Sequence, residues 1–372
     1  MNKIVKKKGR VFVGLSGGVD SSVAAALLKE QGYDVAGVFM RFWGEAGHRE
    51  NGCCSASAEA AARLVAAKLD IPFYSLDVAG EFKKKVVDYF LRELKAGRTP
   101  NPCVICNPQI KFGLFLKYAL KMGADYIATG HYARLKKKIP NPKSQFPKKS
   151  QIPNPKSFYK LFAACDDKKD QTYFLVGLKQ RQLNKIIFPL GDYQKSEVYD
   201  LAMRWRLPYR QGESFDICFI DDYQQFLKKY LKMKPGEIIS PTGYVLGQHQ
   251  GLALSTIGQR VSVGGPGPFY LVRKDVKKNI LYVSNNEKDL LQKEIRVGKI
   301  NWLSGQSPKL PLKCRVKIRY GSEAMEAIIS QQSTAKSQEL EIQFKYPQRA
   351  VTPGQIAVFY KGEEVLGGGV IE

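Results

Sequence analysis

A short glycine–serine loop near the N-terminus of this 372-residue chain has the residue types of an anion-binding site. The apolar run VFVGL, residues 11–15, leads into SGGVDSS, residues 16–22, and a helical pattern continues from there to about residue 32. A strand that enters such a loop before a helix places backbone N–H groups and the positive end of the helix dipole around one anion-sized hollow. We therefore expect a phosphate group here. In a purely structural role, the same residues would only make the turn and cap the helix.

The loop lacks the lysine of the commonest phosphate-binding pattern. In a Walker loop, G-x-x-x-x-G-K-[ST], the lysine reaches the β- and γ-phosphates, and this sequence contains no such match. SGGVDSS instead resembles the PP-loop of the ATP pyrophosphatases. That resemblance implies that the loop holds the pyrophosphate leaving group of ATP while a substrate oxygen is adenylated.

Seven cysteines, at positions 53, 54, 103, 106, 165, 218 and 314, are the second group of residues that could do chemistry. In a long chain of cytosolic character they are not expected to form a disulfide framework, so they either react or fill the core. Cys103-x-x-Cys106 has the spacing of half a zinc site. A structural zinc would need a second close pair, and the adjacent Cys53 and Cys54 are poorly spaced for one, so we predict no metal site of this kind.

The chain is strongly basic, with 59 Lys and Arg against 34 Asp and Glu and a formal net charge of +25. Residues 136–158, KKKIPNPKSQFPKKSQIPNPKSF, hold seven lysines and no acid, and the rest of the chain still carries +18. Such an excess of positive charge points to a polyanionic partner, and we expect nucleic acid. No stretch approaches the roughly 20 apolar residues of a membrane span, and no apolar leader follows the basic N-terminus, so we expect a cytoplasmic protein without a membrane partner.

Three units are expected along the chain. Up to about residue 132, short β-branched runs alternate with helical runs, which is typical of a parallel sheet whose ligands bind at the carboxyl ends of the strands. Residues 136–158 repeat the hexapeptide IPNPKS without apolar periodicity, so we predict a mobile insert at a hairpin. Residues 235–294 are rich in Gly and Pro, and short strand-like runs follow from 295, which favours a small barrel or sandwich. We place the units at 1–222, 223–294 and 295–372.

Six further blocks of sequence indicate a particular enzyme family. They are AGRTPNPCVICNPQIKFG (96–113), ATGHYA (128–133), DKKDQTYFL (167–175), DICFI (216–220), TIGQR (256–260) and AVTPGQIAVFY with LGGGVIE (350–372). In this order, and over the whole chain except the insert, they resemble the tRNA-specific 2-thiouridylases of the MnmA type. The resemblance implies an α/β PP-loop domain of the adenine-nucleotide-hydrolase type, a small central domain and a C-terminal β-barrel that contacts tRNA.

The resemblance also implies the reaction, that of a tRNA-uridine 2-sulfurtransferase. ATP, with Mg²⁺, adenylates the C2 oxygen of the wobble uridine of tRNA, and a persulfide sulfur replaces that oxygen, so that AMP and pyrophosphate are released. Adenylation converts a poor leaving group into a good one, and a persulfide is a nucleophile at neutral pH because sulfur ionises readily. The expected partners are tRNA and a sulfur-carrier or cysteine desulfurase protein, and we expect a monomer.

The resemblance assigns residues to the two substrates. The positions implied at ATP are Gly14, Leu15, Ser16, Gly17, Gly18, Val19, Asp20, Ser21, Met40 and Gly130. The positions implied at tRNA are Asn101, Pro102, Cys103, His131, Lys169, Asp170, Gln171, Arg319, Tyr320 and Gln355, of which the first three would face the target base. For Asp20 the most plausible role is Mg²⁺ coordination. For His131 a satisfied structural imidazole is an equal alternative.

Cys106 and Cys218 match the two catalytic cysteines of these enzymes. In the scheme that the resemblance implies, Cys218 carries the persulfide and Cys106 closes a disulfide with it when sulfur leaves. Cys103 stands where many members have an aspartate assigned as acid/base, so either Cys103 substitutes for that aspartate or the assignment is weaker than supposed. For Cys165 and Cys314 we favour core filling, and Cys53 and Cys54 are left undecided.

Alternatives remain open at this point. Cys103, Cys106 and Cys218 are also the minimum set for a [4Fe–4S] cluster with one open iron, but their spacing is not a complete cluster signature, so we favour the persulfide route. A PP-loop ligase for a small metabolite would need neither paired cysteines nor a high positive charge. A non-catalytic RNA-binding protein would not need an intact SGGVDSS loop.

Overall fold

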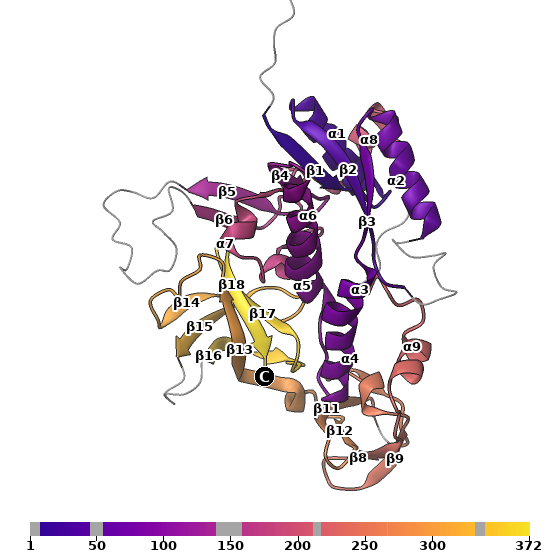
Figure 1. Cartoon of the computed structure of the whole chain (residues 1–372). Helices are drawn as coiled ribbons and strands as arrows, with labels where there is room; N and C mark the ends of the chain where they lie inside the picture. The colour runs from indigo at the N-terminus through magenta and orange to yellow at the C-terminus, as the bar shows by residue number, and fades with distance from the viewer. Residues whose placement is uncertain (1–7, 45–54, 139–157, 211–216, 266, 332–338) are drawn as a thin grey trace, which may run out of the picture.

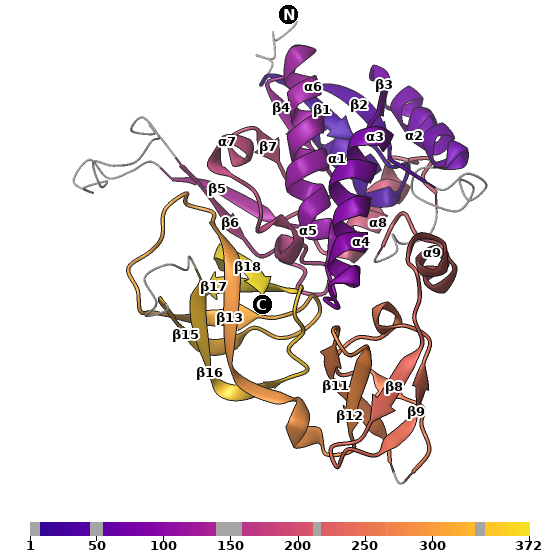
Figure 2. The ribbon, with the colours of Figure 1, turned by 60° about the horizontal axis from the view of Figure 1, so that its bottom comes forward.

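The computed structural model describes residues 8–44, 55–138, 158–210, 217–265, 267–331 and 339–372. The chain forms an α/β unit, a small β unit and a β-barrel, and the α/β unit lies next to both of the others (Figures 1 and 2). Among the helices in these ranges, none has the combination of length and apolar character that crossing a membrane requires.

A five-stranded sheet forms the centre of the α/β unit. Its order is β3-β2-β1-β4-β7, and every neighbouring pair is parallel. The strands are β1 (Arg10–Gly14), β2 (Asp34–Arg41), β3 (Phe73–Asp77), β4 (Tyr126–Ala128) and β7 (Ile186–Ile187). The side chains of residues 11–13 in β1 are at most 1% exposed, because helices cover both faces of the sheet and a fully buried strand favours a continuous apolar run. The predicted α/β domain with a parallel sheet is confirmed.

Helices and short helical turns connect and follow these strands. They are α1 (Val19–Glu30), α2 (Ala56–Lys68), α3 (Ala79–Phe82), η1 (Lys83–Val87), α4 (Asp88–Lys95), α5 (Pro102–Cys106), η2 (Asn107–Leu114), α6 (Phe115–Lys121), η3 (Thr172–Leu175), α7 (Gln180–Leu183), α8 (Lys195–Arg204) and α9 (Tyr223–Tyr230). Helix α1 packs against α8, since Val23, Leu27, Val198 and Ala202 belong to one buried cluster. The start of α8 is thereby held next to the start of α1.

Strand β1 lies where the order of the sheet reverses. The chain goes from β1 to β2 on one side, whereas the other neighbour of β1 is β4, which comes after β2 and β3 in the sequence. In open α/β sheets, the carboxyl ends of the strands at such a reversal are the usual ligand position. The loop 15–18 follows β1 here, and residues 129–131 follow β4.

The central unit is a second five-stranded sheet with the order β10-β11-β12-β8-β9. Its elements are β8 (Gly236–Ile239), β9 (Val245–His249), η4 (Leu252–Leu254), β10 (Arg260–Val261), β11 (Phe269–Asp275), β12 (Ile280–Ser284) and η5 (Glu287–Leu290). A small buried cluster that includes Phe269, Leu271 and Leu281 forms its core. The predicted small central domain is confirmed as a separate β unit.

The C-terminal unit is a closed barrel. Its strands are β13 (Leu291–Trp302), β14 (Leu312–Lys317), β15 (Met325–Gln331), β16 (Leu340–Arg349), β17 (Ile356–Lys361) and β18 (Glu364–Ile371). Strand β13 pairs with both β16 and β18, and this second pairing closes the sheet. Inward side chains such as Val297, Ile329, Ile342 and Phe359 are fully buried and form its core. The predicted C-terminal β-barrel is confirmed.

A hairpin from the α/β unit extends the sheet of the barrel. Strands β5 (Arg134–Lys138) and β6 (Phe158–Phe162) pair with each other, and β6 also pairs with β18 through Leu161 and Phe162. Lys136 to Lys138 and Phe158, which we assigned to the insert, therefore lie in paired strands. The remainder of the predicted mobile insert, 139–157, lies outside the described residues.

Candidate active site

The loop after β1 has a conformation that only glycine can provide at one position. Gly17 has φ +79°, and a Cβ there would lie 2.7 Å from the carbonyl oxygen of Ala58 in α2. The hydroxyl of Ser21 accepts from the backbone N–H of Ser16 at 3.1 Å and donates to the carbonyl of Gly18 at 3.0 Å. Ser22 also donates to that carbonyl, at 2.9 Å. These bonds fix the turn that starts α1.

The structure places all ten residues predicted at ATP around this turn or beside it. Gly14, Ser16, Gly17, Gly18 and Asp20 follow one another at the end of β1 and the start of α1. The side chains of Leu15, Val19 and Ser21 are buried, so any contact of Leu15 or Val19 with a ligand would use the backbone. Met40 lies in β2 and Gly130 follows β4, and a Cβ on Gly14 would lie 3.3 Å from the terminal methyl of Met40.

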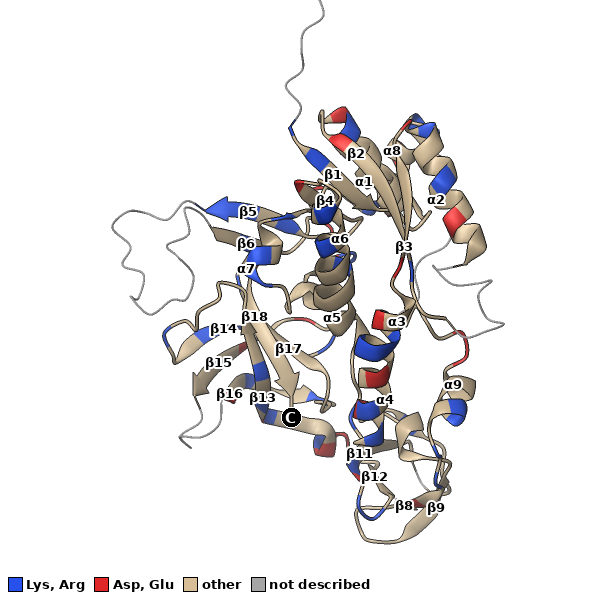
Figure 3. Ribbon diagram, in the orientation of Figure 1, with Lys and Arg blue, Asp and Glu red and all other residues tan. Residues whose placement is uncertain are grey.

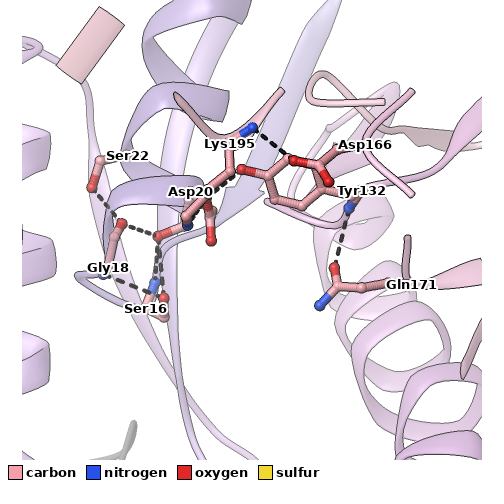
Figure 4. A network of polar contacts seen from close by, with 9 residues as sticks. Ser16, Gly18, Asp20, Ser22, Tyr132, Asp166, Gln171 and Lys195 are labelled. Atoms are coloured by element: carbon pink, nitrogen blue, oxygen red, sulfur yellow. Dashed lines mark hydrogen bonds and ion pairs between the residues drawn. The ribbon is translucent and has the colours of Figure 1, made fainter. Parts of the chain in front are cut away.

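A polar network joins Asp20 of the loop to residues far away in the sequence (Figure 4). Asp20 Oδ1 accepts from the Tyr132 hydroxyl at 2.8 Å and from Lys195 Nζ at 2.6 Å. Burial, with the charge of Asp20 as the second cause, raises the pKa of Tyr132, so this hydroxyl remains a donor. Lys195 is the first residue of α8, and its side chain is 15% exposed.

The same network reaches the loop 166–171. Tyr132 exchanges two hydrogen bonds with Gln171, one from the Tyr132 N–H to Gln171 Oε1 and one from the Gln171 N–H to the Tyr132 carbonyl. The backbone N–H of Lys195 donates to Asp166 Oδ2 at 2.9 Å. Asp166 Oδ1 accepts from the backbone N–H groups of Lys168 and Lys169. The loop that contains the predicted tRNA contacts is therefore hydrogen-bonded to the residues that hold Asp20.

Sequence reasoning missed Lys195, Tyr132 and Asp166. A signal for Lys195 was present, because a cation in the first turn of a helix is unfavourable for the helix dipole. Gln194 and Glu197 already provide the capping box of α8, so Lys195 is not needed for capping. A lysine at such a position calls for an anionic partner.

Cys103 and Cys106 lie on α5, which is placed by its N-cap and by the junction of the three units. Asn101 accepts from the backbone N–H of Cys103 at 3.1 Å. Just before it, Thr99 donates its N–H to the Pro353 carbonyl, and its own carbonyl accepts from Gln355 Nε2 at 2.8 Å. Gln355, predicted at tRNA, thus anchors the segment that leads to the cysteines.

Cys106 and Cys218 pack on one hydrophobic core. Cys106 is 5% exposed within that cluster, and the partly buried Cys218 packs against it. Phe219, next to Cys218, makes edge contacts with Phe82 and Phe90. Met40, beside the loop, belongs to the same cluster. The core that supports the two cysteines therefore extends to the candidate ATP site.

The described residues contain no group of three or more His, Cys, Asp or Glu side chains arranged to hold a metal ion. Cys103, Cys106 and Cys218 are all described, so they do not form such a set, and the residues do not fit the three-cysteine ligation of a [4Fe–4S] cluster. The hydrogen bonds that Asp20 accepts from Tyr132 and Lys195 both use Oδ1, so Oδ2 is the oxygen suited to a Mg²⁺ that is held together with phosphates.

The predicted tRNA residues fall into two groups. His131 is 9% exposed between the rings of Phe112 and Phe188, and its Nδ1 lies 2.7 Å from the Thr129 hydroxyl. Burial lowers the pKa of His131 well below its usual range, which favours the structural imidazole. Asp170 is buried too and accepts from the Thr172 hydroxyl at 2.7 Å and the Ala164 N–H at 3.0 Å. Direct contact of these two residues with tRNA stays a prediction.

The other group lies where the barrel meets the α/β unit, and within it Arg319 and Tyr320 are exposed whereas Lys169 and Gln171 are half-buried. Arg319 and Tyr320 follow β14, and the Tyr320 ring packs on Phe174 with centroids 4.4 Å apart. Lys169 lies at the start of the same loop as Gln171, and Pro102 is buried in α5. Lys169 and Gln171 of the α/β unit and Arg319 and Tyr320 of the barrel thus lie on the two sides of one junction.

A basic hollow of about 870 Å³ lies on the outer face of the barrel. Among its described lining residues are five cations, Lys293, Lys313, Arg315, Lys345 and Lys361, and one acid, Glu326. Lys and Arg are also prominent on the nearby β5 and on β13 (Figure 3). Every second residue from 313 to 319 is a Lys or Arg, and Tyr320 follows directly. The hollow therefore presents positive charge toward solvent.

Two cysteines that we expected in the core differ from each other. Cys314 packs against the barrel core, and burial raises its pKa to about 12. Cys165 is exposed, so the prediction of core filling was wrong there. The backbone of Cys165 is held by the Gly191 carbonyl and by the side-chain amide of the exposed Gln194, and the thiol lies outside the core. Cys53 and Cys54 lie outside the described residues.

The parallel sheet with this loop at its switch point defines an α/β protein of the PP-loop class. Three family profiles match in succession: "tRNA methyl transferase HUP domain" over residues 9–222, "tRNA methyl transferase PRC-barrel domain" over 224–285 and "Aminomethyltransferase beta-barrel domain" over 292–371. The tRNA-specific 2-thiouridylase MnmA of Geobacillus thermodenitrificans is 43% identical over 100% of this chain and 96% of its own. The enzyme of the same name from Halalkalibacterium halodurans is 44% identical over 98% and 94%. The chain belongs to the tRNA-specific 2-thiouridylase MnmA family.

Solved structures add little to this. NMN synthetase from Francisella tularensis matches with a TM-score of 0.29 and 15% identity, over 55% of this chain and 63% of that chain.

Proposed function

We propose that this protein is a tRNA sulfurtransferase that makes 2-thiouridine at the wobble position, with ATP as the activating substrate. The observation that carries the proposal is the extended core of the candidate site, which includes Met40 beside the loop and Cys106 and against which Cys218 packs. A small-metabolite ligase has no use for this pair of cysteines. A passive RNA-binding protein has no use for the loop.

The ATP step uses the loop and Asp20. The N–H groups at the start of α1 and the positive end of its dipole would hold the phosphates of ATP. Asp20 and the phosphates would hold Mg²⁺, which supplies charge neutralisation when pyrophosphate leaves. Gly130 lies against α1 with no room for a side chain, so it lets the end of β4 pack closely against the phosphate loop. The product of this step is the adenylated C2 oxygen of uridine.

The sulfur step uses Cys218 and Cys106. A persulfide on Cys218 attacks C2 through its terminal sulfur, the C2–O bond breaks, and AMP leaves with the oxygen. The Cys106 thiolate then attacks the Sγ of Cys218, and the S–S bond to the terminal sulfur breaks. That sulfur stays on C2 as the thiocarbonyl, and Cys106 and Cys218 form a disulfide. A thiol reductant and a persulfide donor protein reset the site for the next turnover.

The RNA would lie along the basic side of the molecule. Lys169 and Gln171 on one side of the junction and Arg319 and Tyr320 on the other would contact the anticodon arm, and the hollow of the barrel would face phosphates. In this arrangement residues 101–103 face the target base at the start of α5, next to Cys106.

Mass spectrometry of tRNA nucleosides tests the proposal. The gene is expressed in a host that lacks its own enzyme, and tRNA nucleosides are compared with those of the empty host. We expect 2-thiouridine derivatives with the wild-type gene and none with Asp20→Ala, while Asp20→Ala still binds tRNA. A methylated uridine instead would favour the methyl transferase named in the family profiles. Unmodified uridine with a well-expressed protein would refute the proposal.

A further inference from the structure

We propose that Lys195 supplies the phosphate-binding cation that the loop itself lacks. In the described structure Lys195 Nζ is held by Asp20, and we infer that it moves from that carboxylate to the β- and γ-phosphates when ATP enters. The inference rests on the proposed use of ATP, and it assigns a binding residue to the same site.

The first support is position. A Walker loop has its lysine within the loop, whereas SGGVDSS has none. The chain returns to the loop 175 residues later, and Lys195 Nζ lies 2.6 Å from Asp20 Oδ1 in the first turn of α1. An ammonium group is therefore within a single ion-pair length of the turn where the phosphates are expected.

The second support is the way the side chain is held. The stem of Lys195 is mostly buried, and Nζ lies 5.0 Å from the ring centre of Tyr199 and 5.9 Å from that of Tyr132. The ring faces stabilise a cation without neutralising it. The backbone of Lys195 is fixed by Asp166, so the stem can swing while its base stays in place. Lysine suits this role because it is a flexible point charge.

The third support is charge. The Lys195 side chain opposes the dipole at the start of its own helix, so its position does not stabilise α8. Asp20 offers one negative charge, whereas the triphosphate of ATP offers several, so the lysine gains by exchanging partners. Release of Lys195 also removes a competing positive charge from Asp20, whose Oδ2 would then hold the cation that accompanies the phosphates. One exchange would therefore prepare both residues for ATP.

The test separates contact with phosphates from a general structural role. Binding of AMP and of an ATP analogue with a methylene between the α- and β-phosphorus atoms is measured by calorimetry, with Mg²⁺ and without tRNA. We expect Lys195→Ala to weaken analogue binding by about 10- to 100-fold, which is the range for removal of a charge-assisted hydrogen bond. Binding of AMP should change by less than about 3-fold. Lys195→Arg should recover most of the analogue affinity.

Two control experiments distinguish contact with phosphate from indirect effects of the Lys195 substitution. Lys185 also lies over a tyrosine ring, that of Tyr126 at 5.7 Å, and Lys185→Ala should leave both ligands unaffected. In an Asp20→Asn background, Lys195→Ala should still weaken analogue binding. If that second effect disappears, Lys195 only neutralises Asp20 and the inference is wrong. If Lys195→Ala is unstable, Lys195→Gln replaces it as a neutral residue of similar length.

Two further results would contradict either the role of Lys195 or the proposed use of ATP. Equal losses of affinity for AMP and the analogue, or no loss for the analogue, would overturn the inference while leaving the proposed function intact. A wild-type protein that binds neither nucleotide would refute the use of ATP, and the role of Lys195 with it.

Discussion

Gly130 lies so close to α1 that a Cβ on it would stand 2.7 Å from the backbone nitrogen of Ser21. Real side chains do not approach a backbone atom to that distance, so the end of β4 and the phosphate loop can pack together only with glycine at this position. We expect Gly130→Ala to displace the loop and to weaken binding of the ATP analogue by about 10-fold or more, the range for overpacking a tight site. Calorimetric titration checks this.

The control for Gly130→Ala is Gly80→Ala. Gly80 lies in α3, and a Cβ there meets nothing within 4 Å. This change should leave nucleotide binding as it is. Wild-type affinity in Gly130→Ala would show that ATP does not bind at the carboxyl ends of β1 and β4.

The two cysteines make a trapped intermediate possible. If Cys106 breaks the bond between Cys218 and the transferred sulfur, Cys106→Ser should stop the reaction with tRNA bound to Cys218 through a disulfide at C2. Denaturing gels should show a protein–RNA adduct that a thiol reductant releases, and wild-type protein without reductant should show a Cys106–Cys218 disulfide by peptide mapping. The exposed Cys165→Ser variant serves as the control and should behave as wild type.

Anaerobic purification examines the other route for sulfur. The persulfide scheme predicts colourless protein that is active without iron. Brown protein that loses its colour and its iron in Cys103→Ala would contradict the scheme, and it would require the three cysteines to rearrange from their positions in this structure.

The basic hollow of the barrel should contribute to RNA binding through charge alone. Lys313 and Lys361 are both exposed at its lining, and we expect Lys313→Gln with Lys361→Gln to reduce the slope of log K against log salt by about 1 for each phosphate that no longer meets a cation. Filter binding of tRNA over a salt series measures the slope. Lys68→Gln with Lys121→Gln removes two exposed lysines of the α/β unit and should leave the slope unchanged.

Glu59 should make the stability of the α/β unit depend on pH. Two hydrogen bonds from Arg41 at 2.8 Å, and one from Ser75 at 2.6 Å, hold the pKa of Glu59 at about 2. Because this pKa lies below its ordinary value of 4.5, the stabilisation is complete above 4.5 and is lost as the pH falls through about 2. Glu59→Gln should lower Tm by about 2 to 4 °C at neutral pH.

Thermal unfolding over a pH series measures this effect. The Tm values of Glu59→Gln and wild type should converge near pH 2, provided the native state persists there. A constant difference at all pH values would show that the carboxylate charge is not the cause. Glu81→Gln, which removes an exposed i,i+4 pair with Lys85, should have the smaller effect at neutral pH.

The amino-acid sequence by itself determined the local features of the site. Residues 16–22 make their own turn, because the bonds among Ser16, Gly18 and Ser21 span at most five positions and Gly17 adopts its positive φ within the loop. The alternation of strands and helices, the Gly- and Pro-rich middle and the strand-rich C-terminus likewise follow from short-range patterns, so the three units could be predicted. The short sequence motifs likewise indicated the enzyme family, because each is a continuous stretch of sequence.

The tertiary structure decided which distant residues meet. Lys195 reaches Asp20 across 175 positions, and Gln355 reaches Thr99 across 256, since α8 packs on α1 and the barrel closes against the α4–α5 connection. The burial of His131 and the exposure of Cys165 depend on the same packing. A short sequence pattern describes the backbone preferences of neighbouring residues. The choice of contacts between remote segments depends on how all the buried surfaces fit together, and that is settled only when the whole chain folds.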